Sequence, residues 1–107
     1  MQKMVASFIT AANAFDVEGT LSLFAPDAVI DDVSIGDAFV GRDGVRIYFE
    51  RFFVGYNTAS RLLSMEPLDA FNADLRLDFK GDFGHETGIM RIATSSDGLI
   101  ERIDADL

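Results

Sequence analysis

The amino-acid sequence predicts a single α+β domain over residues 1–107, with N-terminal helices packed on a curved antiparallel sheet. Apolar residues recur at helical spacing before Gly55, and the period changes to two from Ala59 onward. Helices gathered early and strands gathered late are typical of this fold class. The length of 107 residues suits one domain, and ten Phe within a hydrophobic fraction of 49% supply its core.

The first half of the chain contains three expected helices. Residues 2–14 have the apolar spacing of an amphipathic helix. Asp16 is a favourable N-cap for a second, short helix, which Pro26-Asp27 ends. Asp43 is expected to cap a third helix, and Gly55 stops it. The apolar residues that define the three helices are Met1, Met4, Val5, Phe8, Ala11 and Ala12, then Val17, Leu21 and Phe24, then Val45, Tyr48, Phe49, Phe52 and Phe53.

The strands are expected mainly in the second half. Residues 28–33 predict one early strand, and residues 34–39 have the composition of a loop. From Ala59 to Pro67 the side chains alternate with the period of two expected for a strand. Pro67 suits a strand end, an edge or a bulge. The clearest alternation runs from residue 74 to residue 80. Further strands are expected over residues 85–94 and 99–106, with turns at residues 69–72, 81–84 and 95–98.

The charge of the chain narrows the classes of partner. The net charge is −9 and the isoelectric point about 4.3, which argues against nucleic acid and against anionic membranes. A neutral or cationic small molecule is easier to host. No run approaches the roughly 18 apolar residues that a membrane-spanning helix needs. The absence of cysteine excludes disulfides and thiolate metal sites, and we expect a cytoplasmic protein.

The pair Asp31-Asp32 is the most informative candidate for chemistry. Neighbouring side chains of a strand point to opposite faces, so one of the two carboxylates faces the helices if the strand continues this far. A carboxylate in an apolar pocket is suited to act as a general base. Periodicity alone does not choose between the two. The alternative interpretation is that the strand ends at Ile30 and both aspartates lie in a solvated turn.

The remaining polar candidates are weaker. His85 is the only histidine and precedes Glu86, but adjacent strand residues face opposite ways, so a solvated edge histidine is favoured. Glu86 belongs either in a pocket or at its rim. Tyr48 is expected in the core with its hydroxyl on a partner, whereas Tyr56 follows a helix end and suits a pocket mouth. No spacing motif indicates a metal site, and no cofactor is expected.

Four short motifs, in this order, resemble the NTF2-like superfamily, and in particular its SnoaL-like cyclases and ketosteroid isomerases. They are Asn13-Ala14-Phe15-Asp16, Leu23-Phe24-Ala25-Pro26-Asp27-Ala28-Val29, Gly41-Arg42-Asp43-Gly44-Val45 and Asp97-Gly98-Leu99-Ile100. The resemblance covers nearly the whole chain. It implies a cone-shaped, cystatin-like fold with a pocket between the helices and the sheet.

The resemblance also implies roles for individual residues. Matching without gaps puts Asp32 on the catalytic aspartate of the isomerases. It puts Phe8 on the tyrosine of their oxyanion hole, and Met90 near the second oxyanion-hole group. Losing one such donor typically costs about 10²–10³ in rate, so steroid isomerase activity is not expected.

Two functions follow as alternatives. The first is an acid/base enzyme of the isomerase, cyclase or dehydratase type, in which Asp32 moves a proton on a small hydrophobic carbonyl compound. The second is a non-catalytic module of the same fold that binds a small ligand or another protein. A homodimer through the outer sheet face is expected from the resemblance, with Thr87 and Ile89, or Ile103 and Ala105, at its interface. The residues expected to line the pocket are Phe8, Tyr48, Phe52, Tyr56, Met65, Glu86 and Met90.

Overall fold

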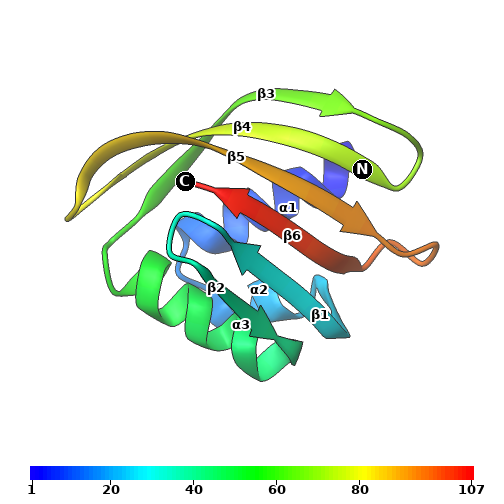
Figure 1. The fold of residues 1–107 in the computed structure, drawn as a ribbon, viewed down its shortest axis with the longest axis horizontal. Helices are drawn as coiled ribbons and strands as arrows, with labels where there is room; N and C mark the ends of the chain where they lie inside the picture. Colours follow the sequence, from blue (N-terminus) through cyan, green and yellow to red (C-terminus); the bar gives the residue numbers. More distant parts are fainter.

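A computed structural model describes residues 1–107 as helices gathered on one side of a six-stranded sheet (Figure 1). This arrangement confirms the α+β fold class. None of the helices is long and apolar enough to cross a membrane. The helical elements are α1 (Gln2–Asn13), α2 (Val17–Leu21), α3 (Gly41–Phe49) and the π-helical turn η1 (Glu50–Val54). The strands are β1 (Phe24–Asp32), β2 (Asp37–Val40), β3 (Ala59–Pro67), β4 (Asn72–Gly81), β5 (Gly84–Thr94) and β6 (Ile100–Asp106).

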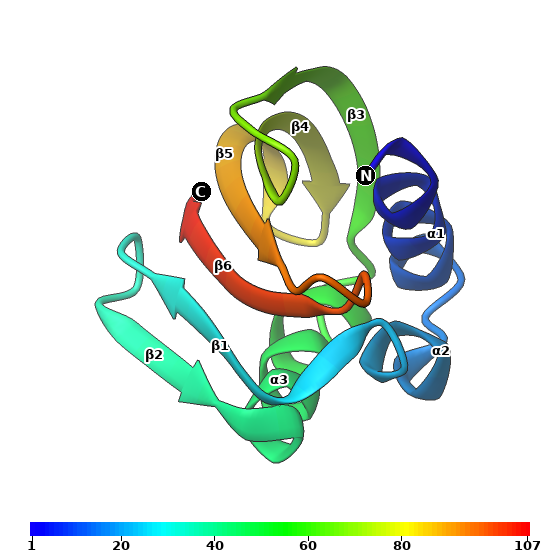
Figure 2. The same cartoon turned by 90° about the vertical axis from the view of Figure 1, so that its right-hand side faces the viewer.

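The sheet has the strand order β2-β1-β6-β5-β4-β3 and curves strongly around the helices (Figure 2). All neighbouring pairs are antiparallel except β1 and β6, which are parallel. The sheet is therefore mixed, because the chain leaves β1 through β2 and α3 and returns beside β1 only with its last strand. The strong curvature gives the sheet an inner face that packs on the helices and an outer face that does not.

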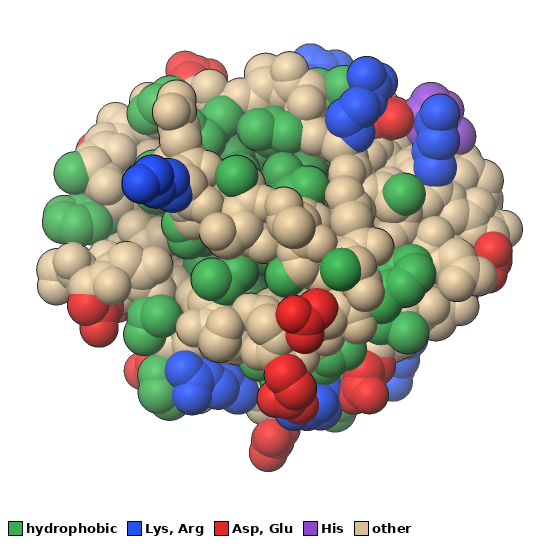
Figure 3. Space-filling view, turned by 180° about the vertical axis from the view of Figure 1, so that it is seen from behind, with side chains coloured by type: hydrophobic (Ala, Val, Ile, Leu, Met, Phe, Trp, Pro, Cys, Tyr) green, Lys and Arg blue, Asp and Glu red, His purple; other side chains and the backbone are tan.

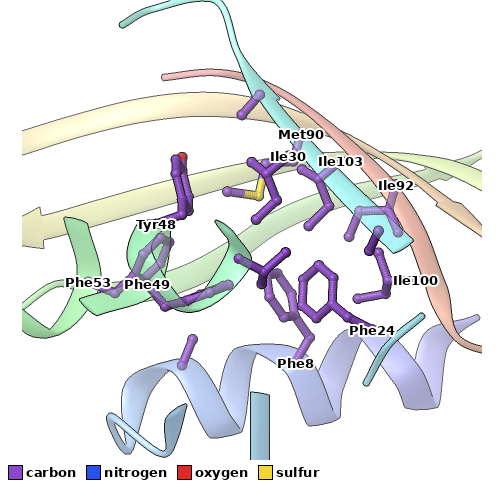
Figure 4. Packing of buried hydrophobic residues seen from close by; sticks show 14 of the residues in the cluster. Phe8, Phe24, Ile30, Tyr48, Phe49, Phe53, Met90, Ile92, Ile100 and Ile103 are labelled. Atoms are coloured by element: carbon purple, nitrogen blue, oxygen red, sulfur yellow. The ribbon is translucent and has the colours of Figure 1, made fainter. Parts of the chain in front are cut away.

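The inner face carries a core rich in aromatic rings (Figure 4). Phe8 of α1, Phe24 of β1 and Phe49 of α3 meet edge to face, with ring centres 5.7 to 6.2 Å apart. Such pairs add to the stabilisation that burial of their area provides. Alternate residues of the strands, Met90 and Ile103 among them, close this core from the sheet side.

Two of the sequence motifs tie the helices to the sheet. The Asn13 side chain donates to the Ser60 carbonyl at 2.9 Å and accepts from the Ser60 amide at 2.7 Å, so α1 is fastened to edge strand β3. The Arg42 guanidinium donates to the carbonyl of Phe24, with its Nη2 at 2.8 Å, and so holds the start of α3 against β1. Asp16 caps α2 by accepting from the amide of Gly19, as the sequence predicted.

The second helix is shorter than predicted. It ends at Leu21, and Phe24 to Asp27 belong to β1 instead. Phe24 pairs with Ile100 of β6, and the pairing register then shifts before Val29. This irregularity accommodates Pro26 within the strand, because a bulge removes the need for the amide that proline lacks.

The segment predicted as a loop over residues 34–39 contains a strand. Residues 37–40 form β2, which pairs antiparallel with the end of β1 and places Phe39 in the core. Asp43 does not cap α3, since Val40 occupies the N-cap position and no side chain caps that helix. Gly41 has a φ of 72°, and a Cβ on Gly44 would lie 2.9 Å from the Phe39 backbone, so glycine is needed at this corner.

One of the two pairs expected at the outer sheet face is wrongly placed. Ile103 and Ala105 are buried on the inner face, because the pairing of β6 with β5 puts them opposite Ile92 and Met90 of the core. Ile89 is 53% exposed and Thr87 is exposed as well. Of the two pairs, only Thr87 and Ile89 are available to a partner.

Candidate functional site

A cavity of about 380 Å³ lies at one end of the space between the sheet and the helices. Eight of its eleven lining residues are hydrophobic. The helical side contributes Tyr48, Phe52 and Phe53, together with Tyr56 just beyond η1. The sheet side contributes the end of β1 with the following turn, the β4–β5 hairpin, and Leu107: Asp32, Ser34, Ile35, Phe79, Phe83, Glu86 and Leu107.

Asp32, the last residue of β1, is a buried carboxylate in the wall of this cavity. Only 3% of the surface of Asp32 is exposed. Oδ1 accepts hydrogen bonds from the amide of Ser34, at 3.0 Å, and from the hydroxyl of Ser34. Oδ2 accepts a hydrogen bond from the Tyr48 hydroxyl at 2.7 Å. These three donors compensate for the loss of water around a buried carboxylate.

Tyr48 reaches Asp32 from the apolar face of α3. Its ring packs among Phe39, Phe49 and Phe52, and its hydroxyl lies at the end that points away from α1 (Figure 4). Burial raises the pKa of Tyr48 well above its ordinary value of about 10, and the hydrogen bond to Asp32 raises that pKa further. Tyr48 therefore stays protonated at neutral pH and acts as a fixed donor to Asp32.

The hydrogen bonds leave Asp32 one unused acceptor position. A carboxylate has about four lone-pair sites, two on each oxygen. Ser34 occupies both sites of Oδ1, and Tyr48 occupies one site of Oδ2. The position that remains belongs to Oδ2, so Oδ2 is the carboxylate oxygen that can accept one further hydrogen bond.

The two aspartates at the end of β1 point to opposite sides of the sheet. Asp31 lies on the outer face, where its carboxylate is 3.2 Å from Nη2 of Arg102. Asp32 lies on the inner face and faces the helices. The strand continues through both residues, and Asp32 pairs with Ala105 in β6 and with Asp37 in β2. The pairing with two neighbouring strands keeps both aspartates out of a solvated turn.

The structure brings four of the seven expected lining residues together. Tyr48, Phe52, Tyr56 and Glu86 line the cavity with Asp32, and Tyr56, 42% exposed, lies at its mouth. Phe8 and Met90 instead line a separate hollow of about 10 Å³ within the core, which is too small for any organic ligand. Met65 of β3 packs against the core and does not line the cavity. Packing under α1 fills the space in which Phe8 and Met90 were expected to contact a ligand.

Several lining residues were not among the sequence candidates. Ser34 had a recognisable signal, because an aspartate that accepts from the amide two residues later forms an Asx turn, a frequent way to leave a strand. Phe53, Phe79 and Phe83 had no such signal, because a phenylalanine at a cavity wall has the same spacing as one in the core. Only the assembled fold shows which phenylalanines border the cavity, and Phe53 and Phe79 belong to the buried core as well.

His85 and Glu86 do not form a pair. His85 lies on the outer face against Asp78, which Arg61 also approaches at 3.9 Å, whereas Glu86 faces the cavity. This is the alternation of a strand, and it agrees with the interpretation of His85 as a partly solvated edge residue. No group of three or more His, Cys, Asp or Glu side chains lies close enough together to hold a metal ion.

The helices on a cone-shaped sheet and the cavity at its open end define the class of NTF2-like, cystatin-fold proteins. The family model of the SnoaL-like domain matches residues 5–88, and the chain belongs to that family. No curated protein sequence matches this chain.

Solved structures with the same fold span nearly the whole chain. One is RV0760c from Mycobacterium tuberculosis in complex with estradiol-17β-hemisuccinate, at 20% identity and a TM-score of 0.86, with 97% of this chain and 90% of that chain covered. Another is protein SMa1630 from Sinorhizobium meliloti, assigned provisionally to the polyketide cyclases, at 21% identity, a TM-score of 0.87 and coverages of 98% and 94%. A third is the epoxide hydrolase/cyclase-like enzyme SalBIII, at 17% identity, a TM-score of 0.86 and coverages of 98% and 88%. At these identities the likeness establishes the fold alone.

Proposed function

We propose that this protein is an acid/base enzyme of the isomerase, cyclase or dehydratase type that acts on a small, largely hydrophobic carbonyl compound. The observation that carries the proposal is the buried Asp32 in the wall of the 380 Å³ cavity, with one acceptor position of Oδ2 unused. A general base of this kind typically contributes about 10²–10⁴ to a rate.

Asp32 would remove a proton from the carbon next to the carbonyl group of the substrate. The proton passes to Oδ2, and the electron pair of the broken C–H bond moves toward the carbonyl oxygen as an enolate forms. In an isomerisation, Asp32 then returns the proton to another carbon of the enolate. In a cyclisation, the enolate carbon attacks a second carbonyl carbon of the same molecule, and the proton passes from Oδ2 to the alkoxide that forms. In a dehydration, the enolate expels the hydroxyl group of the β-carbon, which takes the proton from Oδ2 and leaves as water. Ser34 and Tyr48 hold the carboxylate in place, while the phenol of Tyr56 lies in the cavity without a hydrogen bond to Asp32 and is the candidate donor to the carbonyl oxygen.

The size and the walls of the cavity support a small hydrophobic substrate. Its volume lies at the lower end of the range of about 300–1,000 Å³ that is typical of small-molecule sites. Mostly hydrophobic walls with a few converging polar groups are also typical of such sites. RV0760c, a protein of the same fold, binds estradiol-17β-hemisuccinate, in which a hydrophobic steroid ring system carries a hemisuccinate group.

Proton exchange tests this proposal without knowledge of the natural substrate. A panel of neutral cyclic ketones is incubated with the protein in D₂O, and proton NMR follows the loss of the signal next to the carbonyl. We expect wild type to accelerate exchange for at least one ketone, and Asp32→Asn to lower that rate by about 10²-fold or more. Asp31→Asn is the matched control, because it removes the neighbouring carboxylate on the outer face and is expected to keep the rate.

Equal rates for wild type and Asp32→Asn, with both proteins folded by circular dichroism, would overturn the catalytic proposal. A ketone that binds in a thermal-shift assay but never exchanges would favour the second candidate, a non-catalytic ligand-binding module. The placement of Phe8 and Met90 in the core favours that candidate, since neither supplies a donor to the cavity. An open cavity of this size is less compatible with a cone filled for protein interaction alone.

A homodimer through the outer sheet face remains a proposal from the family resemblance. Ile89 supports it, because a large hydrophobic side chain is exposed there on an interior strand of the sheet. Static light scattering is expected to give the mass of two chains, and Ile89→Lys to give one. A monomeric wild type would contradict this assembly.

A further inference from the structure

The charged groups that line the cavity are all acidic. Asp32 lies in the wall between Ser34 and Tyr48, and Glu86 lies in the exposed part of the wall, across from Phe79 in the β4–β5 pair. No lysine, arginine or histidine lines the cavity. The chain has nine lysines and arginines, and basic and acidic side chains both occur on the face shown in Figure 3. Basic groups are thus present on the surface but do not line the cavity.

Six of the eleven residues that line the cavity are aromatic. Rings follow one another from Tyr48 to the mouth: Tyr48 and Phe52 have centres 5.2 Å apart, Phe52 and Tyr56 are 6.0 Å apart, and Tyr56 and Phe83 are 6.0 Å apart. The faces of such rings attract cations, and quaternary ammonium groups are commonly bound among several of them. Arg51 already places its guanidinium 5.8 Å from the centre of the Phe52 ring, although Arg51 does not line the cavity.

The surrounding charge acts in the same direction as the walls. The net charge of −9 favours the approach of cations and disfavours anions, and a concave site with hydrophobic walls strengthens this effect. An anionic substrate would meet two carboxylates and no counter-charge.

We propose that the preferred ligands of this cavity are organic ammonium compounds, with a compact hydrophobic body and a tertiary or quaternary nitrogen. The nitrogen would lie among Phe52, Tyr56 and Phe83 near the Glu86 carboxylate, and the hydrophobic body would extend toward Asp32. This inference rests on the proposed function in one respect, namely that the cavity binds a small molecule. In a catalysed reaction the substrate would then carry both a carbonyl group and an alkylammonium group.

A pair of probes with the same shape tests the inference. 3-(Trimethylammonio)phenol carries a positive charge, and 3-tert-butylphenol has a carbon atom in place of the nitrogen. Isothermal titration calorimetry near pH 7 is expected to show tighter binding of the cation by about tenfold, the size that a cation over desolvated aromatic rings provides. The preference is expected to shrink as NaCl is added, because salt screens the carboxylates.

Two variants locate the preference in the cavity. Glu86→Gln is expected to weaken binding of the cation by about threefold and to leave the neutral probe unchanged. Glu101→Gln, on the exposed side of β6, changes the net charge equally and is expected to leave both probes unchanged. Phe83→Leu removes one ring at the mouth and is expected to weaken binding of the cation more than binding of the neutral probe.

The outcomes separate this inference from the proposed function. If the neutral probe binds as tightly as the cation or more tightly, the ammonium preference is overturned while the small-molecule cavity stands. If neither probe binds at millimolar concentration, both proposals are contradicted, because both assume that the cavity binds a small hydrophobic molecule. Tight binding of the cation supports the ligand class by itself. If a cyclic ketone that carries a tertiary or quaternary ammonium group then shows no exchange, only the catalytic proposal is contradicted.

Discussion

The space between the sheet and the helices has a filled end and an open end. Under α1, Phe8, Phe24 and Phe49 meet edge to face, and the hollow that remains measures about 10 Å³. At the other end, beside α3 and η1, rings of the same kind surround about 380 Å³. Phenylalanine rings contribute to both ends, and Phe53 and Phe79 line both the small hollow and the cavity. The presence of phenylalanine rings therefore does not distinguish a packed core from a cavity wall.

The difference between the two ends lies in their polar groups and in the exposure of their rings. The open end contains Asp32 with three hydrogen-bond donors, and Tyr56 and Phe83 are about two-fifths exposed at its mouth. The filled end contains no carboxylate among its lining residues, and the hydroxyl oxygen of Ser60 is buried there without a partner. A buried carboxylate whose donors leave one position free is the feature that supports the proposal of a site at the open end.

The largest predicted effect concerns the removal of a ring from each end. Phe24→Ala is expected to lower the free energy of unfolding by about 3–5 kcal/mol, because Phe24 is fully buried against Phe8 and Phe49. Phe83→Ala is expected to lower it by about 1 kcal/mol or less, since that ring is 40% exposed at the mouth. Urea unfolding followed by circular dichroism measures both values.

Phe24→Leu replaces Phe24→Ala if the alanine variant does not fold. We expect Phe24→Leu to lower the free energy of unfolding by less than Phe24→Ala, but by more than Phe83→Ala. Equal losses at the two ends would mean that the cavity is packed as tightly as the core, and the comparison between the ends would fail.

The second prediction concerns the donor that holds Asp32. Tyr48→Phe leaves Oδ2 of a buried carboxylate without its partner, and the free energy of unfolding is expected to fall by about 1–3 kcal/mol. Tyr56→Phe makes the same chemical change at an exposed position and is expected to stay within about 0.5 kcal/mol of wild type. Urea titrations at neutral pH measure both. Near-equal stabilities of the two variants would show that the Tyr48 hydrogen bond does not support the site.

The smallest predicted effect is an alkaline pH dependence. Below pH about 10, Tyr48 is protonated in both the folded and the unfolded chain and contributes no pH dependence. Above that pH the unfolded chain loses the phenol proton while the folded chain keeps it, because burial and Asp32 raise the pKa of Tyr48. The stabilisation that Tyr48 provides is therefore lost as the pH rises, by up to about 1.4 kcal/mol per pH unit.

The decrease of stability with pH is tested by measuring the free energy of unfolding between pH about 9 and about 11. Tyr48→Phe is the comparison, because it has no phenol at position 48 and is expected to lack this decrease. In wild type at high pH, unfolding by urea is expected to release one additional equivalent of tyrosinate absorbance. The same slope in both proteins would contradict a buried, hydrogen-bonded phenol at position 48.

Several elements were predictable because their signal is local. The apolar spacing in residues 2–14 and the alternation in residues 74–80 correspond to α1 and β4 within a few residues. The strand β2 was not predictable, since it has only four residues, begins at Asp37 directly after Gly36, and is too short to show a period. The boundary between α2 and β1 was misplaced because Phe24 suits a helix face and a strand equally, and only its pairing with Ile100 decides.

The sequence by itself determined the order of elements, the four family motifs and the presence of a carboxylate pair at the end of β1. Spacing along the chain carries this information, because helix and strand periods and turn residues act over only a few positions. The tertiary structure alone decided that Asp32 rather than Asp31 faces inward, and that Phe52 lines a cavity while Phe8 fills a core. A period of two leaves the inner face undefined until neighbouring strands and helices cover one side, and the volume left between them exists only in the assembled fold.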